Sequence, residues 1–217
     1  MDLFLIRHGE STKNTRENCN DKLPEHMVSL TEKGVSECHG TGLFLKKYLI
    51  ESGICIDNCV LWVSPFLVTR QSATIINSYL GINDVREDYS LIEQRHGLFT
   101  DRAMQRNRML FKDEFEFYEN YLNNNGEFYA KLPQGEAPMD VAIRTRQFLN
   151  MICLEEKNPI FVISHDITIK TIVMNAFNFS PEWFNQEENM LNGSIRLINN
   201  KEMTDRLIYG GKTKRLQ

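Results

Sequence analysis

The sequence predicts an α/β fold, a three-layer α/β/α sandwich with a mostly parallel central sheet. Three observations lead to this prediction. Short apolar runs of strand length alternate with longer segments whose apolar residues recur at helical intervals. No internal repeat or low-complexity segment interrupts this alternation. Three apolar runs end in polar or cationic residues, and ligands bind beyond the carboxyl ends of strands in such folds.

The first part of the chain is interpreted as a strand, a loop and a long helix. Residues 2–7 form an apolar run that predicts a buried strand. Residues 11–30 are polar and have no clear period, which indicates a loop or a broken helix. A capping box from Ser29 to Glu32 predicts the start of a helix that continues to about Glu51.

The middle of the chain predicts a strand and a helix, followed by an unusual aromatic segment. Residues 59–63 form a short apolar strand that ends at Ser64-Pro65, a strand-to-helix turn signal. Residues 66–80 then have helical spacing. Residues 101–129 are polar and aromatic, with aromatic side chains at helical intervals.

The last part of the chain predicts two helices and two strands. A helix over 139–155 follows Pro138, which suits a first helical turn. Residues 160–164 form a third strand, followed by a helix over about 168–177, and residues 194–198 form a fourth strand. The length of 217 residues suits one domain over residues 1–217, with a helical, aromatic-rich insertion at about 98–132 that we expect to cap the site.

Composition and charge exclude several broad classes of function. The net charge of -4 argues against a nucleic-acid or anionic-membrane binder, because both need a basic face. No apolar run approaches the ~20 residues that span a bilayer, and the first strand begins without a targeting segment before it. Five scattered cysteines without zinc-ligand spacing are interpreted as reduced thiols. We therefore expect a cytoplasmic protein.

Cationic and imidazole side chains follow the predicted strands. Arg7 and His8 end the first strand, Arg70 comes soon after the second, and His165 follows the third. In a parallel sheet these ends lie at the same edge, so two guanidinium and two imidazole groups would meet there. Planar arginine forks suit phosphate oxygens, and we interpret the set as an anion site.

The same residues suit phosphoryl transfer. A histidine can act as a covalent nucleophile if its ring is neutral, and neighbouring arginines favour the neutral form of His8. They would also stabilise charge on the transferring phosphoryl group. The absence of a Cβ at Gly9 would let the backbone approach an anion closely. A leaving alkoxide needs a proton, so a carboxylic acid is expected nearby.

Six sequence blocks carry a family resemblance that spans nearly the whole chain. They are Arg7-His8-Gly9-Glu10-Ser11 with Asn14, Leu30-Thr31 with Gly34, Ser64-Pro65 with Arg70-Gln71-Ser72-Ala73-Thr74, Leu91-Ile92-Glu93-Gln94-Arg95-His96-Gly97, Pro133-Gln134-Gly135-Glu136, and Val162-Ile163-Ser164-His165. Together they resemble the signature of the histidine phosphatase superfamily, also called the phosphoglycerate mutase-like superfamily. Glu93-Gln94, Gly135-Glu136 and the run Phe177 to Glu182 look most like its broad-range phosphatase branch.

The resemblance implies a fold and a mechanism. The fold would be phosphoglycerate mutase-like, and His8 would become a phosphohistidine. Arg7, Arg70 and His165 would hold the phosphoryl oxygens, Asn14 would orient the phosphate, and Glu93 would act as general acid and then as base. No metal or organic cofactor is implied. The expected activity is hydrolysis of small phosphomonoesters, with no nucleic-acid or membrane partner. The oligomeric state, monomer or homodimer, stays open.

One residue departs from the family pattern. Asp166 stands where the family usually has glycine, and its carboxylate would weaken anion binding unless it points away or pairs with a cation. Two alternative functions stay open, and Asp166 supports only the second of them. One is a phosphoglycerate mutase-type phosphoryl transfer, and the other is a non-catalytic phosphate-binding protein.

Some residues near these motifs have two interpretations. Glu10 is a weaker candidate than Glu93 for the acid, and His96 is expected to be an ordinary loop histidine. The four arginines around the insertion either reach a second anionic group of the substrate or lie on a solvated helix face; they are Arg95, Arg102, Arg106 and Arg108.

Overall fold

The computed structural model describes residues 1–15, 23–99, 104–199 and 201–212. Its centre is a six-stranded sheet with the order β3-β2-β4-β1-β5-β6. The strands β3, β2, β4 and β1 pair in parallel, whereas β5 pairs antiparallel with β1 and with β6. The strands are β1 (Asp2–Arg7), β2 (Val60–Val63), β3 (Val85–Glu87), β4 (Ile160–Ser164), β5 (Ile195–Asn199) and β6 (Thr204–Tyr209).

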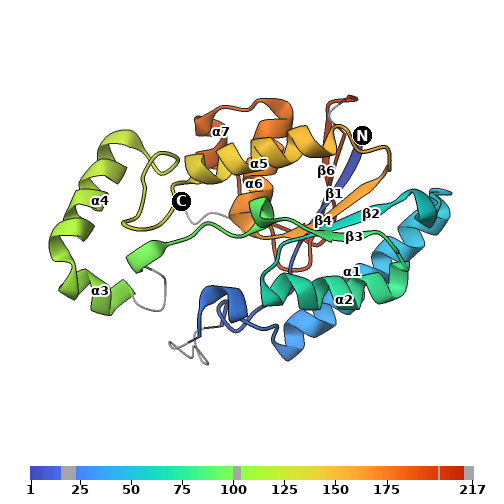
Figure 1. The fold of residues 1–217 in the computed structure, drawn as a ribbon, viewed down its shortest axis with the longest axis horizontal. Helices are drawn as coiled ribbons and strands as arrows, with labels where there is room; N and C mark the ends of the chain where they lie inside the picture. Colours follow the sequence, from blue (N-terminus) through green and yellow to red (C-terminus); the bar gives the residue numbers. More distant parts are fainter. Residues whose placement is uncertain (16–22, 100–103, 200, 213–217) are drawn as a thin grey trace.

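Helices cover both faces of this sheet (Figure 1). The helices α1 and α2 lie on one face, and α5, α6 and α7 lie on the other. The α-helices are α1 (Glu32–Glu51), α2 (Leu67–Leu80), α3 (Met104–Leu110), α4 (Lys112–Asn125), α5 (Pro138–Ile152), α6 (Asp166–Phe177) and α7 (Pro181–Gln186). Single 3₁₀ turns are η2 (Glu25–Met27), η3 (Ile56–Asn58), η4 (Tyr89–Leu91) and η5 (Gly97–Phe99). The predicted three-layer α/β/α sandwich with a mostly parallel sheet is confirmed.

The interior positions of β1, β2 and β4 are apolar because each face of the sheet meets a different helical layer. Leu3 and Leu5 of β1 pack with α5 and α6, in a cluster that includes Phe148 and Ile172. Phe4 and its neighbours on the opposite face pack with α1 and α2 in a second cluster. Successive side chains of a strand point to opposite faces, so one apolar run supplies both cores.

Most element boundaries agree with the sequence predictions, with one correction at α1. The N-cap is Thr31, whose side-chain oxygen accepts a hydrogen bond from the backbone nitrogen of Gly34 at 3.0 Å. The capping box predicted from Ser29 is therefore wrong, because the helix begins one residue after Thr31. The helix predicted from about residue 168 begins earlier, at Asp166, which places its first turn directly after His165.

The two edge strands β3 and β6 were not predicted. Asn199 and Thr204 pair across the short β5–β6 connection, and β3 pairs with β2 through only three residues. Both strands carry charged and exposed positions, so they lack the apolar run that identified the central strands. None of the described helices combines the length and apolar character needed to cross a membrane.

Candidate active site

The predicted strand ends do meet, at the carboxyl edge of three neighbouring strands. In the parallel pairing of β1 with β4, Arg7 lies opposite Ser164. The backbone nitrogen of His8 donates to the carbonyl of Ser164 at 3.1 Å, and the rings of His8 and His165 have centroids 5.0 Å apart. Arg7, His8 and His165 line a cavity of about 210 Å³, and the hydroxyl of Ser64, which follows β2, lies 2.9 Å from Nε2 of His165.

His8 is held as a neutral ring with one nitrogen available for attack. Its Nδ1 lies 2.7 Å from the carbonyl oxygen of Gly9, and a carbonyl only accepts, so Nδ1 carries the proton. The Nε2 lone pair is therefore the nucleophilic one. Burial, followed by the charges of His165 and Arg7, lowers the pKa of His8 from 6.5 to about 3. The ring stays neutral at neutral and mildly acidic pH.

Gly9 is required by packing rather than by an approaching anion. A Cβ at this position would overlap the carbonyl oxygen of Gly34 in α1 and lie 2.8 Å from the sulfur of Cys38. The backbone nitrogen of Gly9 donates to the hydroxyl of Ser72 at 3.2 Å. The role inferred from sequence, backbone contact with an anion, is therefore wrong, because helix α1 occupies that space.

His165 lies between β4 and α6 and is also neutral. Its Nε2 lies 2.9 Å from the hydroxyl of Ser64, and it is the N-cap residue of α6. Burial, followed by the charge of Arg7, lowers the pKa of His165 to about 3. The consecutive residues His165, Asp166 and Ile167 line the cavity, so the N-terminus of α6 adjoins it. Helix N-termini stabilise anions through their unpaired N–H groups and dipole.

Arg7 lines the cavity and is also bound by other groups of the protein. Its Nη1 donates to the carbonyl of Met190 and lies 3.7 Å from Oδ1 of Asp166. Its Nε is buried and has no hydrogen-bond partner among the described residues. The guanidinium is thus held in place with hydrogen-bonding capacity that the described protein groups do not use.

Asp166 pairs with a cation, which is one of the two cases foreseen from the sequence. Its Oδ1 accepts a hydrogen bond from the backbone nitrogen of Met190 at 2.8 Å, beside Arg7. Burial raises the pKa of this carboxyl group, and the nearby Arg7 opposes that shift. Asp166 therefore positions Arg7 and also offsets part of its positive charge.

Glu93 also lines the cavity, as the sequence predicted for a general acid. Its Oε1 accepts hydrogen bonds from the backbone nitrogen of Gln94 at 2.9 Å and from the hydroxyl of Thr168 at 3.4 Å. The weaker candidate, Glu10, is engaged elsewhere: its Oε1 accepts from Thr31 at 2.9 Å, and Lys33 pairs with its Oε2 at 2.6 Å. The structure thus favours Glu93 over Glu10.

Asn14 lies at the cavity with its amide oriented by the loop. Its Oδ1 accepts hydrogen bonds from the backbone nitrogen and the hydroxyl of Ser11, at 2.9 and 2.8 Å. The oxygen is committed to Ser11, so the amide nitrogen is the end that can donate to a phosphoryl oxygen.

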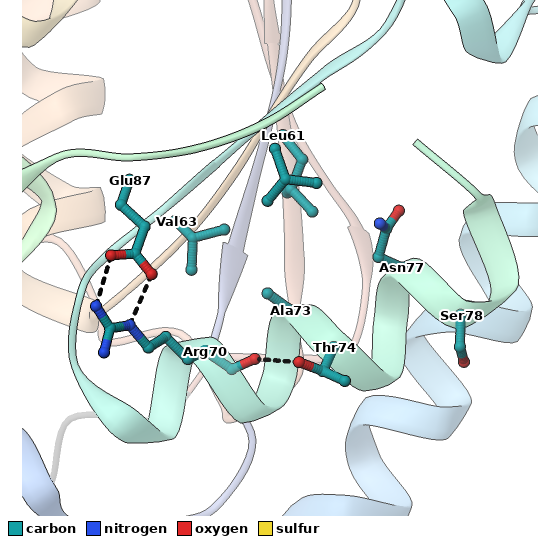
Figure 2. A pocket seen from close by; sticks show the side chains of 9 residues that line it. Leu61, Val63, Arg70, Ala73, Thr74, Asn77, Ser78 and Glu87 are labelled. Atoms are coloured by element: carbon teal, nitrogen blue, oxygen red, sulfur yellow. Dashed lines mark hydrogen bonds and ion pairs between the residues drawn. The ribbon is translucent and has the colours of Figure 1, made fainter. Parts of the chain in front are cut away.

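Arg70 is not among the described residues that line this cavity, although the sequence predicts it as a phosphate ligand. Its Nε and Nη2 each donate to a carboxylate oxygen of Glu87 at 2.6 Å (Figure 2). The reason is helical phase: Val68 and Arg70 are two residues apart on α2 and point to different sides. Val68 lines the cavity, whereas Arg70 lines a separate groove. The role of Arg70 as a phosphate ligand stays a prediction, and in this structure its guanidinium is bound by Glu87.

The groove that contains Arg70 is larger than the histidine cavity, at about 600 Å³. It lies between α2 and the strands β2 and β3 (Figure 2). Its charged residues, Arg70 and Glu87, are paired with each other, and its remaining lining is made of apolar, hydroxyl and amide side chains. It offers none of the reactive groups of the smaller cavity, so we assign the chemistry to the smaller one.

Several cavity residues were not identified from the sequence. Lys13 and Glu25 line the cavity as an ion pair, with 2.7 Å between Nζ and Oε1. The ring of Phe66 packs against His165, with centroids 5.2 Å apart. The sequence around Lys13 and Glu25 has no periodic pattern, so their pairing could not be predicted from it.

His96 is also a cavity residue, in contrast to its expected role as an ordinary loop histidine. Its Nδ1 is buried without a partner among the described residues. The nearby arginines do not line the cavity. Arg95 lies 3.7 Å from Glu136, and Arg108 lies 4.1 Å over the ring of Phe115, while Arg102 is outside the described residues.

The aromatic insertion forms a small core of its own. Phe99, Phe115 and Leu132 pack together with Phe111 and Tyr118. None of the cavity-lining residues that the structure describes comes from α3 or α4. The expectation that the insertion at 98–132 caps the site therefore stays a prediction.

Metal binding was not expected. Over the ranges that the structure describes, no group of three or more His, Cys, Asp and Glu side chains is arranged to hold a metal ion.

Known proteins share both the sequence pattern and the fold. A profile of the histidine phosphatase superfamily (branch 1) matches residues 3–208. The chain is 26% identical over 211 residues to the phosphoglycerate mutase-like protein AT74 of Arabidopsis thaliana, covering 90% of this chain and 64% of that protein. The chain thus spans somewhat less than two thirds of that relative's length. It is 22% identical over 293 residues to the broad-range acid phosphatase DET1 of Saccharomyces cerevisiae, covering 95% and 87%.

Solved structures agree with the fold. The α-ribazole phosphatase of Shigella flexneri superimposes with a TM-score of 0.75 at 17% identity, covering 97% of this chain and 96% of that one. A mycobacterial glucosyl-3-phosphoglycerate phosphatase gives a TM-score of 0.71 at 16% identity, covering 98% and 99%. Since the profile match extends over nearly all of the sequence, this chain belongs to the histidine phosphatase superfamily, branch 1.

Proposed function

We propose that this protein is a phosphatase that hydrolyses small phosphomonoesters through a phosphohistidine at His8. The observation that carries the proposal is the state of the His8 ring. Its Nδ1 is held by the carbonyl of Gly9, and its Nε2 lone pair belongs to a neutral ring in a cavity shared with Arg7 and Glu93. That combination suits nucleophilic attack on phosphorus.

The reaction has two steps, and Glu93 acts in both. In the first, Nε2 of His8 forms a bond to phosphorus as the ester P–O bond breaks, and protonated Glu93 gives its proton to the leaving oxygen. In the second, the Glu93 carboxylate takes a proton from water, the water oxygen bonds to phosphorus, and the P–N bond breaks. The products are an alcohol and inorganic phosphate.

Fixed donors would stabilise the charge on the phosphoryl oxygens. Arg7 is held in the cavity, the N-terminus of α6 adjoins it, and the amide nitrogen of Asn14 can donate. The Ser64 hydroxyl orients His165 beside the same space. Because these groups are held by protein contacts before substrate binds, little reorganisation is needed in the transition state.

The general-acid step gives a direct test of Glu93. We expect Glu93→Gln to reduce kcat/KM for alkyl phosphates by roughly a hundredfold or more, because their leaving groups need a proton. For p-nitrophenyl phosphate, whose leaving group is stable as an anion, the loss should be much smaller. Steady-state phosphate release from both ester types measures the difference. An equal loss for both would contradict the assignment, and Glu10→Gln, outside the cavity, is the matched control.

A mutase is the second candidate, favoured by relatives with phosphoglycerate mutase-like names. Such an enzyme would form the same phosphohistidine but return the group to another hydroxyl of the substrate. Measuring phosphoglycerate interconversion beside phosphate release separates the two activities.

A non-catalytic phosphate-binding protein is the third. Two observations favour it, the pairing of Arg7 with Asp166 and the displacement of Arg70 to Glu87. Binding of vanadate or phosphate without any turnover would support this alternative.

A further inference from the structure

We propose that the His8 cavity selects phosphomonoesters whose leaving group is uncharged or carries an amine, and discriminates against leaving groups that carry a carboxylate or a second phosphate. The inference rests on the proposed function, because it names the substrate class of the same site. It is argued from the charges that line the cavity and from how they are paired.

Carboxylates match the cations among the described residues that line the cavity. The cations are Arg7 and Lys13, and the carboxylates are Glu25 and Asp166, while Glu93 is the proton donor of the first step. Both histidines have pKa values lowered to about 3, so they add no charge at neutral pH. A phosphomonoester brings about two negative charges, and an anionic leaving group would add further negative charge to a set of lining residues whose cations are already paired.

Each cation of the cavity already has a carboxylate beside it. Arg7 lies 3.7 Å from Asp166, and Lys13 lies 2.7 Å from Glu25. A phosphoryl group must share Arg7 with Asp166. A second anionic group near Lys13 would have to compete with Glu25, whose side chain is a quarter exposed. The lining residues that the structure describes therefore supply positive charge for one phosphoryl group and little beyond it.

Other described arginines near the cavity are bound by other groups of the protein. Arg144, whose charge acts on His165, donates to the carbonyl of Ser90 at 2.6 Å and pairs with Glu136 at 3.2 Å. Arg70 is bound by Glu87 with two hydrogen bonds of 2.6 Å. Arg95 lies near Glu136, and Arg108 packs over Phe115. An arginine that binds a substrate anion usually directs the N–H groups of its guanidinium into the site. The guanidinium groups of these arginines contact other protein groups instead.

The rest of the lining suits an alcohol or an amine with an apolar side. Val28, Phe66, Val68 and Ile167 supply apolar surface. The carboxylate of Glu25 lines the same cavity, and beside its pairing with Lys13 it can accept hydrogen bonds from hydroxyl or ammonium groups. A carboxylate on the leaving group would lie against the carboxylate of Glu25, and both groups only accept hydrogen bonds. Binding would then remove water from both groups without supplying a donor, which costs binding free energy.

Two pairs of esters test this preference, since each pair differs mainly in one charged group. Glycerol 1-phosphate and 3-phosphoglycerate differ by a hydroxymethyl group in place of a carboxylate. Phosphoethanolamine and 2-hydroxyethyl phosphate differ by an ammonium in place of a hydroxyl. We expect kcat/KM to be at least about tenfold higher for glycerol 1-phosphate than for 3-phosphoglycerate, and about threefold higher for phosphoethanolamine than for its hydroxyl partner.

A charge change at the cavity mouth should move the first ratio. Glu25→Gln removes one negative charge beside Lys13, so the preference for glycerol 1-phosphate should fall by about threefold or more. The matched control is Glu51→Gln, which removes the carboxylate of an exposed Glu–Lys pair with Lys47 on α1. That variant should keep the wild-type ratio. Equal ratios in all three proteins would overturn the role of Glu25 in selectivity.

Binding measurements separate this inference from the proposed function. Dissociation constants of the four esters are measured by calorimetry with His8→Asn, which keeps the cavity charges and removes the nucleophile. The same order of affinity supports the inference even if the wild-type protein turns over no ester, a result that would overturn only the phosphatase proposal. Tighter binding or faster turnover of 3-phosphoglycerate than of glycerol 1-phosphate would overturn the inference while leaving the phosphatase proposal intact.

Discussion

At the scale of single residues, the reactivity of His8 depends on the burial of its ring and on which ring nitrogen carries the proton. The carbonyl of Gly9 fixes the tautomer, so that the unprotonated nitrogen is Nε2. Burial then keeps the ring neutral, because an imidazolium in the cavity would lie beside Arg7 without bulk water to solvate it. Both effects favour a nucleophile over a cationic phosphate ligand.

The lowered pKa of His8 predicts a specific acid sensitivity. The unfolded chain binds a proton at His8 near pH 6.5, whereas the folded protein binds it only near pH 3. Between these values the unfolded state holds more protons, so the free energy of unfolding falls as pH falls, by up to about 1.4 kcal/mol per pH unit for this group. His8→Asn should therefore lose less stability than wild type between pH 6.5 and 4.5.

Urea unfolding at several pH values measures this difference directly. His39→Asn is a suitable control, because His39 is an exposed histidine on α1 whose Nδ1 lies 2.8 Å from the hydroxyl of Tyr79. It should keep the wild-type slope. Parallel slopes for wild type and His8→Asn would show that His8 is protonated in the folded protein, contrary to the mechanism.

At the scale of elements, the phase of α2 decides which of its residues reach the cavity. Val68 lines the cavity, and Arg70, two positions later, is bound to Glu87 of the edge strand β3 (Figure 2). A helix rotates about 100° per residue, so neighbours two apart lie on different faces. In this structure the cation of the sequence motif therefore lines the groove and not the histidine cavity.

Two arginine substitutions test this placement. We expect Arg70→Ala to change kcat/KM by no more than about twofold, since it removes only an exposed ion pair, which contributes little to stability. Arg7→Ala should reduce kcat/KM by roughly a hundredfold or more, because it removes a preorganised donor. Phosphate release with p-nitrophenyl phosphate measures both. A comparable loss in the two variants would mean that Arg70 reaches the phosphoryl group during turnover.

The same elements show what the sequence could and could not predict. The central strands were identifiable because burial on both faces makes their interior positions apolar, and their polar ends located His8 and His165 near one another. Glu93 follows no strand, and only the family resemblance suggested it. The edge strands were missed because exposure removes that pattern. The pairing of Lys13 with Glu25 depends on a loop without periodicity, so only the three-dimensional structure reveals it.

At the scale of the whole molecule, the site exists only when distant parts of the chain are paired. The strand β1 lies between β4 and β5, which come from the far end of the sequence. This pairing brings His8 within 5.0 Å of His165, measured between ring centroids. Two helical layers bury the strands that carry them, and the buried sheet holds the reacting groups in fixed positions (Figure 1).

The central claim is that His8 carries the phosphoryl group. The most direct measurement mixes the protein with a ³²P-labelled phosphomonoester and stops the reaction rapidly without acid. Proteolysis and mass spectrometry then locate the labelled residue. The account predicts an acid-labile, base-stable phosphohistidine on the peptide that contains His8, absent in His8→Asn and accumulating in Glu93→Gln when p-nitrophenyl phosphate is the donor. Undiminished phosphate release by His8→Asn, or label on any other residue, would contradict it.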